Sequence, residues 1–206
     1  MKILLTGFGP FGEVIRNPTE RLVRHFERRG CSGHDLTTLV LPVAYRVAPA
    51  MVAQAIDQGE ASGAPFDLVW MLGVAASSTA WRVERRGQNL NGGGADAEGV
   101  SPSVMIVPNG PPTLAATVPV DQLVSDLNGS GLHAIESLSA GDYLCNHVFY
   151  RTLWHLGQKE CGTLAGFLHV PPDYETFERR GVGSCVTFAD QVRAAEVTLS
   201  TLTRSA

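Results

Sequence analysis

No run of apolar residues in this sequence approaches the ~18 that a membrane-spanning helix needs. A long basic stretch is also missing, because 16 Lys and Arg residues are mixed with 20 Asp and Glu residues for a net charge of −4. A nucleic-acid footprint and a patch for anionic membranes are therefore not expected. The composition predicts a soluble protein whose partners are small or neutral molecules, with no nucleic acid and no membrane among them.

Cysteines are few and widely spaced. The four of them form no C-x-x-C pair, the spacing common in metal and redox motifs. Glycine and proline interrupt the amino terminus before the apolar segment of a secretory signal could form. We therefore expect reduced thiols and a cytoplasmic protein.

Short apolar runs alternate with amphipathic segments along the chain. A length of 206 residues with 44% hydrophobic content suffices for one sizeable core, so residues 1–206 are expected to form a single domain. The expected strands cover 2–6, 36–41, 68–72, 133–137 and 163–170, and the expected helices open at 17–20 and cover 47–56, 120–127, 145–156 and 188–202. This alternation predicts an α/β fold with right-handed crossovers and a largely parallel sheet covered on both faces.

The segment 73–112 interrupts the pattern, since it is rich in Gly, Ser, Asn and Pro and contains only a short candidate strand at 81–85. Structureless loops of this length are usually functional or mobile. In parallel sheets, sites gather at the carboxyl ends of the strands. Gly7, Gly73 and His169 all stand at such ends, and we expect them to converge with the turn that leads to Cys145.

Cys145 follows a turn and opens a helix. Gly141 and Asp142 are turn formers, and apolar residues recur at helical spacing from Val148 onward. A thiol at a helix start faces unpaired backbone N–H groups and the positive end of the helix dipole, which favour a thiolate and can receive charge from a substrate oxygen. Free cysteine more often serves as a buried hydrophobe. The other cysteines have no comparable setting, so Cys145 is the candidate nucleophile.

A thiol nucleophile needs a base and a third group that orients the base. Among six histidines, His169 ends an apolar strand that stops at two prolines, which makes it the candidate base, although a lone histidine is as often structural. His147 lies two helical positions from Cys145 and therefore points to another face. The carboxylates that could orient the base are Glu84, Glu98 and Asp142, and sequence spacing does not rank them.

Residues 7–12 read G-x-G-x-x-G directly after the first expected strand, as in a dinucleotide-binding turn. In that motif the helix opens within the glycines, whereas here the helix start comes only at Asn17 and Pro18, a capping residue and a favoured first helical residue. Phe8 and Phe11 suit a flat apolar pocket better than a phosphate cradle. Two phenylalanines that plug the core under a loop would give the same pattern.

Three blocks of sequence together resemble the type I pyroglutamyl peptidases, or pyrrolidone carboxyl peptidases. The blocks are 5–12 (LTGFGPFG) with Asn17-Pro18, 83–85 (VER) with 89–91 (NLN), and 139–146 (SAGDYLCN) with 166–171 (GFLHVP). Their order and spacing extend over nearly the whole chain. The resemblance implies an α/β/α open sandwich and a cytosolic cysteine peptidase that uses no metal or cofactor, forms a homo-oligomer (tetramer or dimer), and removes N-terminal pyroglutamate from peptides.

The resemblance also implies residue roles by position. It assigns the nucleophile to Cys145, the base to His169 and the orienting acid to Glu84. The substrate-binding positions it implies are Phe8, Phe11, Asn17, Tyr143 and Leu144. Asn17 reads equally well as a helix cap.

Two positions depart from the pattern of the family's bacterial members. Val74 stands where a Gln often follows the third-strand glycine, and residues 92–95 (GGGA) stand where an Arg often follows Asn91. The missing Arg predicts lower turnover or a shifted substrate preference. Two other functions stay open: a cysteine hydrolase of another small amide or lactam-containing substrate, and a non-enzymatic α/β protein that binds a small ligand or nucleotide at the glycine loop.

Overall fold

The computed structural model describes residues 1–92, 94–159, 161–176 and 186–204. The strands are β1 (Lys2–Phe8), β2 (Asp35–Leu41), β3 (Leu68–Val74), β4 (Trp81–Glu84), β5 (Arg86–Gln88), β6 (Thr113–Ala115), β7 (Ala134–Ser137) and β8 (Leu164–Val170). The helices are α1 (Pro18–Arg29), α2 (Val47–Ala61), α3 (Val120–Gly129), α4 (Leu144–Gly157) and α5 (Phe188–Arg204).

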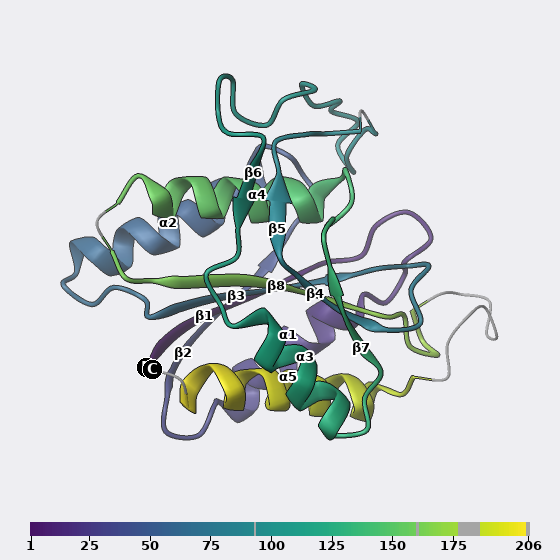
Figure 1. Ribbon diagram of the computed structural model, residues 1–206. Helices are drawn as coiled ribbons and strands as arrows, with labels where there is room; N and C mark the ends of the chain where they lie inside the picture. Colours follow the sequence, from purple (N-terminus) through teal and green to yellow (C-terminus); the bar gives the residue numbers. More distant parts are fainter. Residues whose placement is uncertain (93, 160, 177–185, 205–206) are drawn as a thin grey trace.

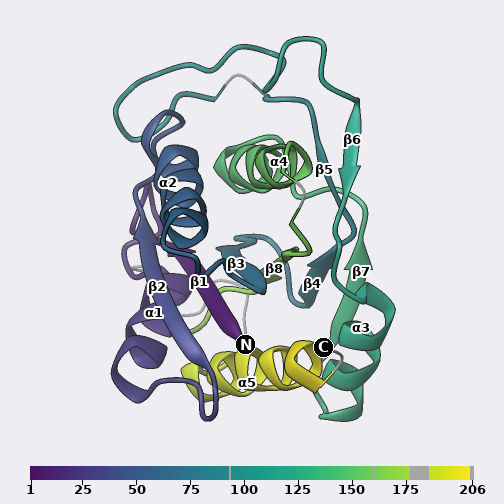
Figure 2. The same ribbon diagram turned by 90° about the vertical axis from the view of Figure 1, so that its left-hand side faces the viewer.

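The described residues form a six-stranded sheet in the order β2-β1-β3-β8-β4-β7, and β5 and β6 pair separately. Helices α2 and α4 cover one face of the large sheet, while α1, α3 and α5 cover the other (Figures 1 and 2). The predicted α/β/α sandwich is therefore confirmed. The short strands β5 and β6 were not predicted, because three residues in a polar loop carry no readable period.

The sheet is mostly but not wholly parallel. β1, β2, β3 and β8 run in one direction, whereas β4 is antiparallel to β8 and β7 is parallel to β4. The chain passes from β3 to β4 through residues 75–80 without a helix, which permits the reversal. The strand before α4 consequently runs opposite to β8, and residues 138–143 bring the start of α4 to the end of β8 (Figure 1).

The core lies on both faces of the sheet. All seven residues of β3 are buried, which explains its unbroken apolar run. One side packs side chains such as Leu22, Trp70 and Leu199 against each other, and the other side packs Met71 and Phe149. Burying a large apolar side chain is worth roughly 1.5–3 kcal/mol, so the strands that lead to the site are firmly held. None of the described helices is long and apolar enough to cross a membrane.

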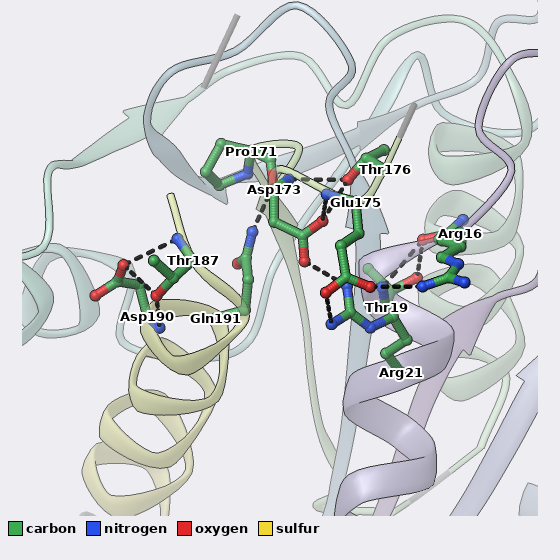
Figure 3. Close-up of polar contacts among 11 residues, drawn as sticks. Arg16, Thr19, Arg21, Pro171, Asp173, Glu175, Thr176, Thr187, Asp190 and Gln191 are labelled. Carbon is green, nitrogen blue, oxygen red and sulfur yellow. Dashed lines mark hydrogen bonds and ion pairs between the residues drawn. The ribbon is translucent and has the colours of Figure 1, made fainter. Parts of the chain in front are cut away.

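A polar cluster fastens the segment that follows β8 (Figure 3). Asp173 accepts a hydrogen bond from Arg21 of α1 at 2.7 Å, and Gln191 of α5 donates to the carbonyl of Pro171. The side chain of Arg21 also stacks over the ring of Phe188, 4.1 Å from its centroid. The segment after the carboxyl end of β8 is thus tied to α1 and α5.

Candidate active site

The end of β3, the end of β8 and the start of α4 meet at one place. Gly73 and His169 are direct neighbours in the parallel β3–β8 pair. A Cβ atom on Gly73 would lie only 2.7 Å from the Sγ atom of Cys145. The absence of a side chain at Gly73 therefore makes room for the thiol, and the expected convergence of these segments is found.

Cys145 is the second residue of α4 and is partly exposed. Among the described residues, no side chain caps this end of the helix, so its first backbone N–H groups are available to a ligand. The next residue, Asn146, is fully buried and grips the chain beside β5: its Nδ2 donates to the carbonyls of Gln88 and Leu90, both at 2.9 Å. This contact anchors the helix start. The sequence offered no signal for it beyond the polar residue type.

His169 lies between Cys145 and Glu84. Its Nδ1 donates to Oε1 of Glu84 at 2.8 Å, and it is also hydrogen-bonded to Cys145. Glu84 is 0% exposed and His169 is 5% exposed. Burial by itself lowers the pKa of His169, but the charges and hydrogen bonds of Cys145 and Glu84 outweigh burial and raise this pKa to about 9. The imidazolium form is therefore favoured at neutral pH.

The other two candidate carboxylates lie elsewhere. Glu98 and Asp142 are both exposed. Asp142 lies against Gly92, where an added Cβ atom would clash with its Oδ2 atom. Of the three carboxylates that the sequence could not rank, only Glu84 contacts His169 in the described part of the chain.

Some aromatic residues near the site are buried in the core, and others are partly exposed. Phe8 is 2% exposed and belongs to the core under the loop. Phe11 is partly exposed and faces Tyr143, with ring centroids 6.3 Å apart, and Tyr45 meets Tyr143 edge-on at 5.6 Å. Leu144 is buried. Tyr45 was not predicted, since a single aromatic residue just before a helix carries no specific pattern.

Asn17 is 1% exposed and its amide is engaged within the protein. Its Oδ1 accepts from the backbone N of Thr19 at 3.0 Å, and its Nδ2 donates to the carbonyl of Gly9 at 2.9 Å. Asn17 therefore caps α1 and closes the loop that carries Phe11. A direct contact between Asn17 and a substrate stays a prediction.

The glycine-rich segment that follows Asn91 packs against the turn before Cys145. The backbone N of Gly92 donates to the carbonyl of Asp142 at 2.7 Å, and the hydroxyl of Tyr143 donates to the carbonyl of Ala95 at 3.0 Å. The end of β3 carries a buried apolar side chain, Val74. The glycine-rich departure thus contacts the turn that leads to Cys145, and Val74 directly follows Gly73, the residue that lies against the Sγ atom of Cys145.

His147 has a structural setting. Its Nδ1 donates to Oδ1 of Asn91 at 3.0 Å, and its ring packs edge-on against Tyr45. Burial and the charge of Arg151 lower the pKa of His147 to about 4. It is therefore neutral at physiological pH, and within the described structure its ring is hydrogen-bonded to Asn91 and not to Cys145.

A family model described as pyroglutamyl peptidase matches residues 1–204. The chain is 32% identical over 202 residues to the pyrrolidone-carboxylate peptidase of Oceanobacillus iheyensis, covering 98% of both chains. It is 35% identical over 175 residues to that of Mycobacterium tuberculosis strain H37Ra, covering 82% of this chain and 77% of the relative.

Solved structures of proteins with the same names have a similar fold. The pyrrolidone carboxyl peptidase of Thermococcus litoralis matches with a TM-score of 0.89 at 28% identity, covering 98% of this chain and 93% of that one. The pyroglutamyl peptidase I of Bacillus amyloliquefaciens matches with a TM-score of 0.88 at 25% identity, covering 98% and 97%. Because the sequence match and the fold match both extend over nearly its whole length, the chain belongs to the pyroglutamyl peptidase family.

Proposed function

We propose that this protein hydrolyses the amide bond after an N-terminal pyroglutamyl residue, with Cys145 as nucleophile, His169 as base and Glu84 as the group that orients His169. The observation that carries the proposal is the hydrogen-bonded line from Cys145 through His169 to the buried carboxylate of Glu84. A nucleophile, a base and an orienter within hydrogen-bond reach are the parts that covalent amide hydrolysis needs.

The first half of the reaction forms a thioester. The thiolate of Cys145 attacks the carbonyl carbon of the pyroglutamyl residue, while the proton of the thiol is held by His169. The backbone N–H groups at the uncapped start of α4 stabilise the oxyanion that forms. As the C–N bond breaks, His169 gives its proton to the leaving amine.

The second half releases the product. Neutral His169 takes a proton from a water molecule, and the resulting hydroxide attacks the thioester carbon. The C–S bond then breaks, pyroglutamate leaves, and Cys145 returns as a thiolate beside protonated His169. Glu84 keeps the imidazole in the tautomer with Nε2 free for these transfers, because Nδ1–H is donated to its Oε1.

The lactam ring requires an apolar slot with few charges, since it has no free amine. Phe11 and Tyr143 provide an aromatic surface beside Cys145, and Phe8 supports it from below. Leu144 fills the core behind this surface. We assign Asn17 to the same pocket as the residue that holds the loop of Phe11, through the hydrogen bond from its Nδ2 to the carbonyl of Gly9.

The test is hydrolysis of a chromogenic pyroglutamyl anilide under reducing conditions. Wild type should cleave it, and should leave the alanyl and prolyl anilides intact. Cys145→Ser should abolish turnover, whereas Cys161→Ser, which changes another partly exposed free thiol, should not. The proposal is wrong if Cys145→Ser keeps wild-type turnover or if wild type prefers another anilide.

We further propose that residues 1–206 act as one catalytic domain in the cytoplasm, as a homo-oligomer of two or four copies. Free thiols at the cysteines of the described residues support a reducing compartment.

The support for an oligomer is a set of exposed apolar side chains in one long segment, Leu90, Val104 and Met105, which another copy of the chain would bury. Light scattering of the purified protein tests the oligomer, and a monomeric mass at micromolar concentration would contradict it.

A further inference from the structure

Arg82 lies beside the candidate catalytic residues without belonging to them. It is the direct neighbour of His169 in the antiparallel β4–β8 pair, and it precedes Glu84 by two positions, so both side chains lie on the same face of β4. The Nε atom of Arg82 is 3.5 Å from Oε1 of Glu84. Neither this Nε atom nor Oε2 of Glu84 has a hydrogen-bond partner in the described residues. The Nε atom of Arg82 and the carboxylate of Glu84 therefore face each other away from water, although the side chain of Arg82 as a whole is partly exposed.

The same guanidinium holds the turn that leads to Cys145. Its Nη2 atom donates to Oγ of Ser137 at 2.7 Å and to the carbonyl of Ser139 at 2.8 Å. One side chain thus connects the buried carboxylate with the backbone that positions the nucleophile.

The charge of Arg82 matters most when His169 is neutral. Glu84 has no exposure to water, and a buried carboxylate without an opposite charge is strongly disfavoured. While His169 is protonated, its imidazolium supplies that charge. Once His169 has given its proton to the leaving amine, Arg82 is the cation that pairs with Glu84 among the residues the structure describes.

We propose that Arg82 is a positioning residue of the reaction, which supplies the second counter-charge of Glu84 and ties the Glu84–His169 pair to the turn before Cys145. This inference rests on the proposed function. In the described part of the chain, the other titratable groups that face the pair are Cys145 and, beyond it, Tyr143. Strand β7 presents uncharged Ser137 to Glu84.

The charge effect has a definite sign. The active form of the Glu84–His169 pair holds one proton, and losing this proton leaves a net negative charge that Arg82 stabilises. Without the charge of Arg82 the proton is lost less readily, so the alkaline limb of kcat/KM moves to higher pH. A neighbouring charge shifts a titration by about 1–3 pH units. Because the side chain of Arg82 is 32% exposed, we expect about one pH unit here.

The experiment compares Arg82→Met and Arg82→Lys with the matched control Arg86→Met. Arg86 also donates to a carbonyl of this turn, that of Leu138 at 3.0 Å, but it forms no ion pair with Glu84 in the described structure. Arg82→Met should move the alkaline limb of kcat/KM to higher pH by about one unit. It should also lower kcat about 10-fold, with KM within about twofold of wild type. Arg82→Lys should keep the wild-type limb, and Arg86→Met should keep both the limb and kcat.

The proposal is overturned if Arg82→Met lowers kcat without moving the limb, if Arg82→Lys moves the limb as far as Arg82→Met does, or if Arg86→Met matches Arg82→Met. Arg82→Gln is the second uncharged variant should Arg82→Met fail to fold by circular dichroism, and it carries the same expected shift. Wild-type turnover of the pyroglutamyl anilide is measured in parallel, so that a failure of the proposed function is distinguished from a failure of the role of Arg82.

Discussion

Replacing Glu84 with Gln removes the negative charge from the Glu84–His169 pair and leaves its size almost unchanged. The 2.8 Å hydrogen bond from His169 would then end on a neutral oxygen. Hydrogen bonds to charged groups contribute about 1.5–3 kcal/mol, which corresponds to a loss of roughly 10- to 100-fold in kcat/KM at neutral pH.

The pH dependence gives the sharper readout. The charge of Glu84 helps to raise the pKa of His169 to about 9, against the opposing effect of burial. In Glu84→Gln this pKa falls, because burial is then balanced by Cys145 alone. The imidazolium that protonates the leaving amine is consequently lost at lower pH, and the alkaline limb of kcat/KM moves downward.

The assay is steady-state hydrolysis of a pyroglutamyl anilide between pH 5 and 10. Glu98→Gln is the matched control, since it makes the same chemical change at an exposed position of the neighbouring loop, and it should behave as wild type. The reasoning is refuted if Glu84→Gln keeps the wild-type alkaline limb with kcat/KM within threefold of wild type. A shift opposite to that of Arg82→Met is expected.

Three further changes have expected results. Gly73→Ala places a Cβ atom 2.7 Å from Sγ of Cys145, so kcat on the anilide should fall at least about 10-fold while far-UV circular dichroism is kept. The pKa of His147 is about 4 when folded, below its ordinary 6.5, so its contribution to stability is lost as pH falls from 6.5 to 4. His147→Phe should reduce this acid loss, measured by urea unfolding, by about 3 kcal/mol. Asp173→Asn should lower the free energy of unfolding by about 1–3 kcal/mol, because Asp173 is buried and paired with Arg21.

For each of these three predictions, one result would contradict the reasoning. Wild-type kcat in Gly73→Ala would show that the thiol is not confined by β3. An equal acid loss in wild type and His147→Phe would assign that loss to other groups. Asp173→Asn should cost more than Glu175→Gln, whose carboxylate is about half exposed in the same cluster; equal costs would contradict the role of burial.

Local patterns in the sequence were sufficient for much of the fold. The apolar run of β3, the capped start of α1 at Asn17 and the helix after Cys145 depend on neighbours in the chain, and all are found where they were expected. The reversal of β4 was not predicted. It depends on pairing with β8 and β7, which lie far away in the sequence.

The candidate site likewise has residues that local sequence features predict and residues that only strand pairing brings in. Cys145 and His169 stand out from the sequence because a helix start and a strand end are local features. Glu84, Glu98 and Asp142 are chemically equivalent in the sequence, and only the antiparallel β4–β8 pair brings one of them to His169. The ion pair between Arg82 and Glu84 follows from that same pairing and from the turn beside β7.

The sequence by itself therefore determined the α/β architecture, the candidate nucleophile and base, and, through its resemblance to a known family, the expected chemistry. The tertiary structure decided which carboxylate meets the base, which aromatic residues line the surface and which lie beneath it, and what Asn17 contacts. The physical reason is that periodicity and capping are interactions between near neighbours. Charge pairing in a dry interior instead depends on distances between strands, which only the folded chain sets.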